Sequence, residues 1–466
     1  MSVNSNIINN YKKNLKIKKG GFNLKMKSGI YASLDIGTTS IKVIVAEVLN
    51  GQMNVIGVGN ERANGLSRGM IVDIDLTAAS IQSAIRQAED KADVTINELI
   101  VGIPANDVQM NSCYGGISIN HNQQEISDEH VRNVVEKAIE GSLNQDREVV
   151  SISLDEFTLD GFDEIKDPRG MIGNRLEFKG TIASLPRSIV HNIRKAVERA
   201  GYSIRNIVLS PEAMGEVALS EDERNFGGIL IDMGGGQTTV SVIHENQLKH
   251  SKVIQEGGEY VTKDISIVLN TTVKNAEKLK RDVGNAYYPN TNADRTIAVD
   301  VVGQKDVTTI KESYISEIIE ARLTQIFEQL KFSLDNIGAL NMPAGIIISG
   351  GAASLPGIDA LTEEIFNVPV RIYVPDFMSI RYPTFTNAIG LVITETNLSE
   401  VEELILESIL KKTVSNQNSR TAVQQPVTQT SQPVQDDYTD TSSAENAENK
   451  EPMGDKLKKF FSGFFD

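Results

Sequence analysis

Two segments of the chain carry a short glycine- and threonine-rich turn directly after an aspartate. Asp35 precedes the sequence IGTTSIK, and Asp232 precedes MGGGQTT. Small residues let backbone N–H groups approach an anion closely, and hydroxyl groups add further donors. Both turns are therefore predicted to bind phosphate. The predicted phosphate-binding residues are Gly37, Thr38, Thr39, Ser40, Lys42, Gly234, Gly235, Gly236, Thr238 and Thr239.

The two turns lie in similar surroundings, which suggests an internal duplication. From Leu34 and from Ile231 the sequence reads as a strand ending in aspartate, the turn, a second strand, a polar turn and a third strand. One such turn alone is more often an ordinary hairpin, but two matching copies favour a binding site. Two opposed domains could clamp a polyphosphate between the turns. Asp35 and Asp232 could then hold Mg²⁺ directly or through water.

A third glycine-rich turn, ISGGAASLPG, runs from Ile348 to Gly357. It could be a plain strand-to-helix connection that needs positive φ angles. Its position after both phosphate turns favours a flat platform for a base and ribose. The predicted contacts are Gly350, Gly351, Ala352 and Leu355. The chain contains no G-x-x-x-x-G-K-[ST] sequence, which excludes the P-loop ATPases.

The segments that must position these turns alternate between strand-like and helix-like patterns from Tyr31 to about Glu395, which indicates an α/β class. The net charge of −16 argues against a nucleic-acid-binding protein. The single cysteine, Cys113, excludes an intrachain disulfide and a cysteine-based zinc site. The five histidines show no metal-ligand spacing. No stretch is apolar and long enough to predict a transmembrane helix.

Both ends of the chain differ from this middle part. Residues 1–29 carry seven lysines and no acidic residue, and are predicted to be a disordered basic leader. The leader is either an irrelevant or misannotated extension, with Met26 as the true start, or an arm attracted to anionic lipid. Residues 413–452 contain no Leu, Ile or Phe and are rich in Ser, Thr, Asn and Gln. Such a composition predicts a disordered linker.

The last thirteen residues, GDKLKKFFSGFFD, have a helical apolar period. Spacings of i, i+3, i+4, i+7 and i+8 place the apolar side chains on one stripe, with lysines on its flanks. This pattern is typical of a helix lying in a membrane interface, and a helix docked on the protein itself or on a partner is the alternative. A single copy should bind weakly, and a polymer should bind through many copies. The predicted membrane-binding residues are Lys456, Leu457, Lys458, Lys459, Phe460, Phe461, Phe464 and Phe465.

The three turns, in this order and spacing, resemble the phosphate-1, phosphate-2 and adenosine motifs of the superfamily of actin, Hsp70 and sugar kinases. The sequence LPRSIVHNIRKAVERAGY with VLSPEAMGEVAL is similar to the first connecting helix of that superfamily, and Thr384–Ile393 is similar to the second. There Ala388 and Gly390 would permit close packing of helices. The resemblance implies ATP and Mg²⁺ as ligands. It adds Gly258, Glu277 and Lys280 as adenosine contacts, although an ordinary solvated ion pair is the alternative for the last two.

Within the superfamily the chain resembles the FtsA family of bacterial cell-division proteins from Gly29 to about Thr396. Four features account for this resemblance: GIYASLDIGTTSIKVIVAEV, the segment Glu61–Asp73, the inserted segment from NELIVGIP through NRLEFKGTIASLP, and the amphipathic terminus. The resemblance implies an actin-like (ribonuclease H-like) α/β fold, a duplicated two-domain ATPase with an FtsA-type 1C subdomain insert. The boundaries that it implies are subdomain 1A 30–96, insert 1C 97–180, return to 1A with the connecting helix 181–208, subdomain 2A 209–256, subdomain 2B 257–330, subdomain 2A again 331–383, subdomain 1A again 384–412 and membrane-targeting helix 454–466. Composition alone predicts the leader at 1–29 and the linker at 413–453.

The function implied is that of an ATP-binding protein that polymerises at the inner face of the cytoplasmic membrane, at the division septum. It would tether the FtsZ ring by binding the C-terminal peptide of FtsZ through subdomain 2B, and recruit later divisome proteins. An MreB-like shape-determining filament or another soluble actin-like ATPase is the alternative. Two other classes are disfavoured. A sugar kinase would need a catalytic aspartate, which no motif identifies, and an Hsp70 would need a peptide-binding domain after the core, where this chain has a predicted linker.

One position departs from the hydrolysing relatives. They often carry Glu or Gln before the connecting proline, where the side chain orients the attacking water, and this chain has Ser210 before Pro211. Glu212, two residues on, is only a weak candidate for a catalytic group. Because positioning of the water is a large part of phosphoryl-transfer catalysis, the sequence predicts nucleotide binding with at most slow ATP hydrolysis.

Overall fold

The computed structural model describes residues 26–119, 124–142, 146–292, 294–304, 306–377 and 380–421, with side chains to residue 410. The chain divides into a compact unit, Met1–Asn416, and a second unit, Gln417–Asp466. The predicted leader up to residue 25, the linker beyond residue 421 and the amphipathic helix at 454–466 lie outside the described residues.

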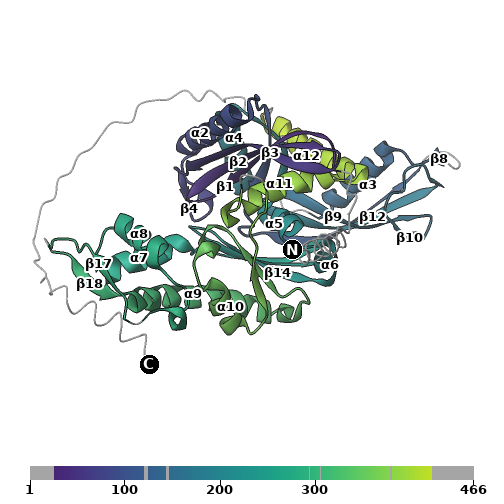
Figure 1. Ribbon diagram of the computed structural model, residues 1–466. Helices are drawn as coiled ribbons and strands as arrows, with labels where there is room; N and C mark the ends of the chain where they lie inside the picture. The colour runs from purple at the N-terminus through teal and green to yellow at the C-terminus, as the bar shows by residue number, and fades with distance from the viewer. Residues whose placement is uncertain are drawn as a thin grey trace, which may run out of the picture. The chain divides into compact units, whose positions relative to one another are not determined.

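Two five-stranded sheets form the centre of the molecule and share one arrangement (Figure 1). In each, three consecutive antiparallel strands are followed by two strands added in parallel. This repetition confirms the duplicated α/β fold predicted from the two turns. The first sheet has the order β13 (Ser203–Leu209), β6 (Glu98–Ile103), β1 (Gly29–Ile36), β2 (Ser40–Leu49), β3 (Gln52–Arg62). The second has the order β16 (Gln247–Ile254), β15 (Thr238–His244), β14 (Gly228–Met233), β19 (Ile346–Ser349), β20 (Val370–Ile372).

The central strands β1, β2, β14 and β19 are almost entirely buried, and their sequences are rich in Ile, Val and Leu. Continuous apolar strands of this kind are expected where helices cover both faces of a sheet. Helices α2 (Ile74–Ala92) and α4 (Arg187–Arg199) pack on one side of the first sheet, with Ile81, Ile85 and Val190 inaccessible to solvent. Asp73 caps α2 by accepting a bond from the N–H of Leu76, at 2.9 Å.

Helices α5 (Ser210–Ala218) and α11 (Thr386–Asn397) lie at the junction of the two sheets. They touch backbone to backbone, since a Cβ atom added at Gly390 would lie 2.0 Å from the carbonyl oxygen of Ala213. The close packing predicted for Gly390 is therefore confirmed. Of the two segments proposed for the first connecting helix, α5 is the one that meets α11, whereas α4 packs against α2.

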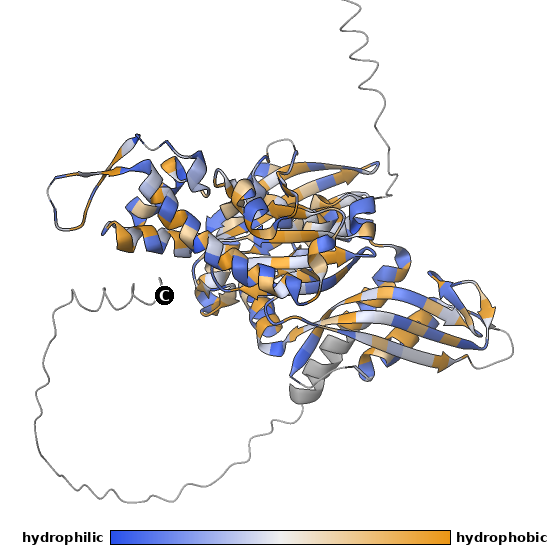
Figure 2. Cartoon of the chain, turned by 90° about the horizontal axis from the view of Figure 1, so that it is seen from below, coloured by the Kyte–Doolittle hydropathy of each residue, from blue (hydrophilic) through white to orange (hydrophobic). Residues whose placement is uncertain are grey.

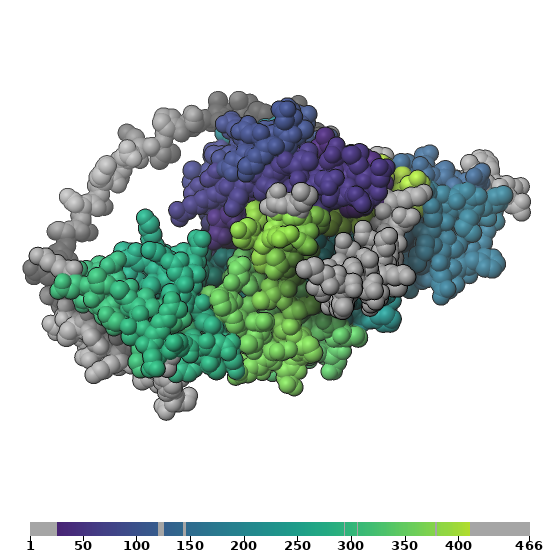
Figure 3. Space-filling view, viewed as in Figure 1, coloured from purple at the N-terminus to yellow at the C-terminus, as the bar shows by residue number. Residues whose placement is uncertain are grey.

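The second sheet carries a helical subdomain that projects beside the first domain, and the space-filling view is hollowed between the two (Figure 3). Its core contains Val261, Ile319 and Phe327, which are buried. The elements of this subdomain are α7 (Gly258–Val268), α8 (Val273–Val283), η1 (Tyr288–Asn290), β17 (Thr296–Val299), β18 (Thr308–Lys311) and α9 (Glu312–Asp335). The short helix η2 (Ala339–Asn341) follows α9, and η3 (Gly351–Ser354) and α10 (Ile358–Phe366) pack on strands of the second sheet.

An inserted subdomain with its own sheet and core follows β6. The sheet order is β10 (Phe162–Ile165), β9 (Arg147–Leu159), β12 (Arg175–Pro186), β7 (Gln109–Ser118), covered by α3 (Asp128–Glu140). Apolar and polar residues alternate along β12, as the strand colours of the insert in Figure 2 illustrate. Phe157 and Phe178 meet edge to face in the core, with 5.4 Å between ring centroids. Small elements complete the described chain: β4 (Leu66–Ser67), β5 (Met70–Ile71), β8 (Gln124–Glu125), β11 (Ile172–Gly173), α6 (Glu221–Phe226) and η4 (Pro383–Phe385).

Three predicted boundaries need correction. The predicted insert starts at residue 97, but β6 pairs in parallel with β1 inside the first sheet, so the insert begins after Ile103. Residues 384–412 are predicted to return to subdomain 1A, but only α11 does so. Helix α12 (Glu400–Thr421) places Val401, Leu404 and Ile405 in the core of the insert, and it extends beyond the predicted linker start at residue 413.

No helix among the described residues has the length and apolarity that crossing a membrane requires.

Candidate functional site

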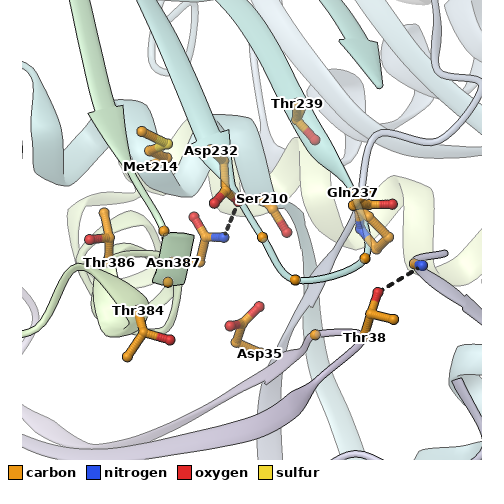
Figure 4. A pocket seen from close by; sticks show the side chains of 18 of the residues that line it. Asp35, Thr38, Ser210, Met214, Asp232, Gln237, Thr239, Thr384, Thr386 and Asn387 are labelled. Carbon is orange, nitrogen blue, oxygen red and sulfur yellow. Dashed lines mark hydrogen bonds between the residues drawn. The ribbon is translucent and has the colours of Figure 1, made fainter. Parts of the chain in front are cut away.

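The two glycine-rich turns face one cavity of about 100 Å³ between the sheets (Figure 4). Each turn follows the carboxyl end of a central strand, β1 or β14, and closes on itself: the N–H of Gly37 bonds the carbonyl of Ser40, and the N–H of Gly234 bonds that of Gln237. Strand ends at the middle of an α/β sheet are where such folds bind ligands. The structure thus brings together two turns that lie almost 200 residues apart in the sequence.

The predicted phosphate-binding residues divide into two groups. Ser40 and Thr238 do not line the cavity, because Ser40 closes its turn through the backbone and the Thr238 hydroxyl donates to the carbonyl of Glu256, at 2.9 Å. The other eight line the cavity: Gly37, Thr38, Thr39, Lys42, Gly234, Gly235, Gly236 and Thr239.

Lys42 and Asp35 form a buried ion pair at the cavity, with 3.1 Å between Nζ and Oδ2. They sit opposite each other in the β1–β2 ladder, and each residue is less than a tenth exposed. A buried cation beside the first turn suits a polyphosphate ligand, because it neutralises charge without a long side chain having to be ordered on binding.

Asp232 occupies the matching place after β14 and is held by Asn387, whose Nδ2 donates to Oδ2 at 2.8 Å. Burial raises the pKa of Asp232 to about 6, opposed by the bond from Asn387 and supported by the nearby charge of Asp35. Two carboxyl groups and an amide at one cavity fit Mg²⁺, which takes few protein ligands and completes its shell with water and phosphate oxygens. Among the described residues, no group of three or more His, Cys, Asp or Glu could hold a metal alone.

The predicted adenosine contacts lie partly in the cavity wall and partly beside it. Gly350 and Gly351 line the cavity, whereas Ala352 and Leu355 pack against the second-domain core. The remaining three form a cluster on α7 and α8 next to this turn: Gly258, Glu277 and Lys280.

Lys280 forms hydrogen bonds within that cluster and is not a solvated surface group. Its Nζ donates to the carbonyl of Gly258 at 2.9 Å and to the hydroxyl of Thr262 at 2.8 Å, and pairs with Glu277 at 2.8 Å. The Lys280 side chain is only 15% exposed. The cluster lies close to the third turn, because a Cβ atom added at Gly258 would lie 3.4 Å from that of Ala352.

Several residues in the cavity wall are absent from the sequence prediction. Asn387 lies within the predicted second connecting helix, and Gly69 lies within Glu61–Asp73, so both segments were singled out without a role for these residues. The N–H of Gly69 donates to Thr38 Oγ1 at 2.9 Å. No spacing rule links positions so far apart in the chain. The wall residues not predicted as contacts include Gly69, Ser210, Pro211, Met214, Gln237, Thr384, Thr386 and Asn387.

Glu212 is not placed to act on a ligand in this cavity. Its Oε1 accepts a bond from Ser151 Oγ at 2.9 Å, and it lines a second cavity of about 830 Å³ on the other side of α5. Burial raises the pKa of Glu212 to about 7, and the neighbouring charge of Glu216 acts in the same direction. Ser210 does line the first cavity, and its hydroxyl donates to the carbonyl of Ile103 at 3.2 Å.

The raised pKa values predict that the free energy of unfolding falls as the pH rises from about 5 to 8. A carboxyl whose folded pKa lies above its unfolded pKa costs nothing below the unfolded value, and its cost is complete above the folded value. Because one pKa unit is worth about 1.4 kcal/mol, Glu212 should cost on the order of 3 kcal/mol at pH 8. Denaturant titrations of the Glu212→Gln variant between pH 5 and 8 should show a flatter dependence than the unmodified protein. The exposed Glu259→Gln should not change it, and equal slopes for both variants would contradict the prediction.

Known proteins share both the sequence and the architecture described above. The family described as "Cell division protein FtsA" matches residues 229–390, and the family described as "SHS2 domain inserted in FTSA" matches residues 105–184. The chain is 49% identical over 442 residues to "Cell division protein FtsA" of Enterococcus hirae, covering 94% of this chain and all of that protein. The protein of the same name from Bacillus subtilis is 39% identical, covering 78% of this chain and 82% of that protein.

Solved structures with the same fold are much more distant in sequence. The "PilM-PilN type IV pilus biogenesis complex" contains a chain with a TM-score of 0.53 and 15% identity, covering 80% of this chain and all of that chain. MreB5 of Spiroplasma citri, solved bound to ADP, has a TM-score of 0.50 and 15% identity, covering 83% and 98% of the two chains. At this identity the likeness concerns the fold alone.

Proposed function

The chain belongs to the FtsA family of cell division proteins, and we propose that it polymerises at the inner face of the cytoplasmic membrane and tethers the FtsZ ring there. The observation that carries the proposal is the pair of duplicated turns facing one cavity, with the Lys42–Asp35 pair and Asp232 in its wall. This arrangement supports nucleotide binding, the property on which an actin-like polymer depends.

ATP with Mg²⁺ is the proposed ligand. The backbone N–H groups of Gly37, Gly235 and Gly236 would receive phosphate oxygens, and Lys42 would balance their charge. Asp35 and Asp232 would hold Mg²⁺, directly or through water. The cluster around Lys280 would receive the ribose and base at the third turn. An ADP complex of the actin-like MreB5 gives independent support to this choice of ligand.

The proposed partners follow from the family. FtsZ would contribute its C-terminal peptide to the helical subdomain at 257–330, and later divisome proteins would be recruited to the assembled polymer. Anionic lipids would bind the terminal segment 454–466, where every apolar residue falls on one helical stripe. Because one short helix binds reversibly and many copies bind together, assembly and membrane attachment should reinforce each other. The proposed location is the cytoplasmic side of the cell membrane at the division septum.

Sedimentation with anionic liposomes, with and without Mg-ATP, tests the proposed function. The full chain should sediment with liposomes more strongly when Mg-ATP is present, and a chain ending at Glu451 should stay in the supernatant in both conditions. FtsZ filaments should be carried down only by the full chain. If both chains sediment with the liposomes equally, the membrane contact lies elsewhere in the chain; if neither chain does, a soluble actin-like ATPase is favoured.

Exchanging Phe460 and Phe464 for glutamate should release the protein from liposomes. Each buried phenylalanine contributes roughly 1.5–3 kcal/mol when fully buried, and two charges on the apolar stripe also cost desolvation. The bound fraction in the liposome assay should therefore fall at least tenfold. Phe332→Glu is a matched control, because Phe332 is 69% exposed on α9 and lies outside the terminal segment. An unchanged bound fraction in the double variant would refute the anchor.

ATP hydrolysis is expected to be slow, with a turnover below about 1 s⁻¹, under the usual range for kinases. Ser210, which stands where a water-orienting Glu or Gln would be, has a short side chain bonded to the carbonyl of Ile103. Phosphate release from purified protein under Mg-ATP measures this rate. Ser210→Gln should raise it several-fold and Ser210→Ala should leave it low. Many turnovers per second by the unmodified protein would contradict the prediction.

A further inference from the structure

Helix α5 separates two cavities and contributes side chains to both. Ser210, Pro211 and Met214 line the nucleotide cavity. Glu212 and Glu216 face the second cavity, whose walls also come from β9 of the insert, from β16 at the edge of the second sheet and from α12. Because a nine-residue helix is rigid, a movement of the α5 residues at the nucleotide cavity also moves the α5 residues at the second cavity.

Strand β9 of the insert is bonded to both halves of the duplicated core. Near its start, Ser151 Oγ donates to Glu212 Oε1 at 2.9 Å. Four residues further along, Asp155 Oδ1 accepts from Gln247 Nε2 of β16 at 2.8 Å, and Gln247 also reaches the carbonyl of Leu154 at 3.4 Å. Side-chain hydrogen bonds thus join β9 to α5 and to the second sheet, and Glu148 at the start of β9 also pairs with Arg194 of α4, at 3.0 Å.

A nucleotide needs more room than the first cavity offers while the two phosphate turns are in contact. The cavity measures about 100 Å³, whereas pockets for ligands of this class usually measure roughly 300–1,000 Å³. The phosphate turns are in contact, since a Cβ atom added at Gly235 would lie 2.2 Å from Thr39 Cγ2, and one added at Gly236 would lie 2.5 Å from Thr38 Cγ2. Opening the turns shifts the second sheet, and with it Gln247, relative to the first sheet, and α5 packs on strands of both sheets.

We propose that Glu212 is a positioning residue that couples occupancy of the nucleotide cavity to the orientation of the insert. Its hydrogen bond with Ser151 transmits the movement of α5 to β9, while the contact between Asp155 and Gln247 ties the same strand to the second sheet. The proposal rests on the nucleotide binding proposed above. When the sheets move apart, the two contacts on β9 move by different amounts, and the insert turns. Because coupling between two sites is reciprocal, breaking the Ser151 contact must also change the affinity for the nucleotide.

The experiment compares Ser151→Ala with Ser153→Ala on the full chain without liposomes. Ser153 lies on the same strand and lines the same cavity. Hydrogen exchange of peptides covering 147–159, with and without Mg-ATP, reports the response of the insert, and calorimetry reports the dissociation constant for ATP. Ser151→Ala should reduce the ATP-dependent change in exchange by more than half and shift the dissociation constant at least threefold. Ser153→Ala should match the unmodified protein in both readouts.

Three further variants keep the test decisive if Ser151→Ala is poorly folded. Gln247→Ala removes the other contact and should also reduce the ATP-dependent change in exchange. Glu212→Gln keeps an acceptor oxygen for Ser151 and should behave like the unmodified protein, whereas Glu212→Ala should not. If ATP binds but exchange at 147–159 does not respond, or if Ser151→Ala and Gln247→Ala respond normally, the coupling is refuted and the proposed function stands. If ATP does not bind at all, the proposed function itself fails.

Discussion

Replacing Gly236 with valine is expected to weaken ATP binding by about 100-fold or more. A Cβ atom at this position would lie 2.5 Å from Thr38 Cγ2, so a branched side chain forces the two phosphate turns apart and covers the backbone N–H groups between them. Loss of two hydrogen bonds to a charged group costs about 3–6 kcal/mol, and every 1.4 kcal/mol is about tenfold in affinity. Calorimetric titration with Mg-ATP measures the effect.

Gly116→Val is the matched control for this prediction. Gly116 is exposed on strand β7 of the insert, and the nearest atom to an added Cβ is Glu177 Cγ at 3.7 Å. Valine suits a strand, so ATP affinity should stay within about twofold of the unmodified protein, well under one decade of affinity. If the two variants bind ATP equally well, the turn after β14 does not contact the phosphates.

Replacing Gly390 with leucine is expected to lower the free energy of unfolding by about 3 kcal/mol or more. Extra atoms forced into a well-packed contact cost about 1–3 kcal/mol, and occasionally more. Here the obstacle is the backbone carbonyl of Ala213, 2.0 Å from an added Cβ atom, so relaxation requires α5 and α11 to move apart. The higher helix propensity of leucine offsets only about 1 kcal/mol of this loss. Denaturant titration followed by circular dichroism measures the change.

Gly141→Leu provides the comparison, because nothing lies within 4 Å of a Cβ atom added there and its φ of −79° suits any residue. Its unfolding midpoint should remain close to that of the unmodified protein. A Gly390→Leu protein of unchanged stability would show that α5 and α11 can separate at little cost. The helices would then be a hinge and not a fixed crossing.

The sequence by itself determined the features that depend on nearby residues. Asp35 and Asp232, each followed by small residues, mark strand ends and turns because glycine and hydroxyl residues act locally on the backbone. Ala388 and Gly390, two small residues in an apolar helix, mark a close crossing because small side chains let another helix approach. The same local patterns show that the order of strands and turns after Leu34 is repeated after Ile231, and the two sheets have this repeated order.

Only the tertiary structure decided which distant groups meet, because packing brings together side chains that no local period relates. Asn387 bonds Asp232 across 155 positions of sequence. Glu212 stands two residues after Ser210, yet the turn of a helix sends its side chain into another cavity, toward Ser151. The family resemblance implies that residues 384–412 return to the first domain, but the apolar face of α12 is buried by the insert. In each case the contact depends on which apolar surface or unpaired polar group the packed sheets leave uncovered.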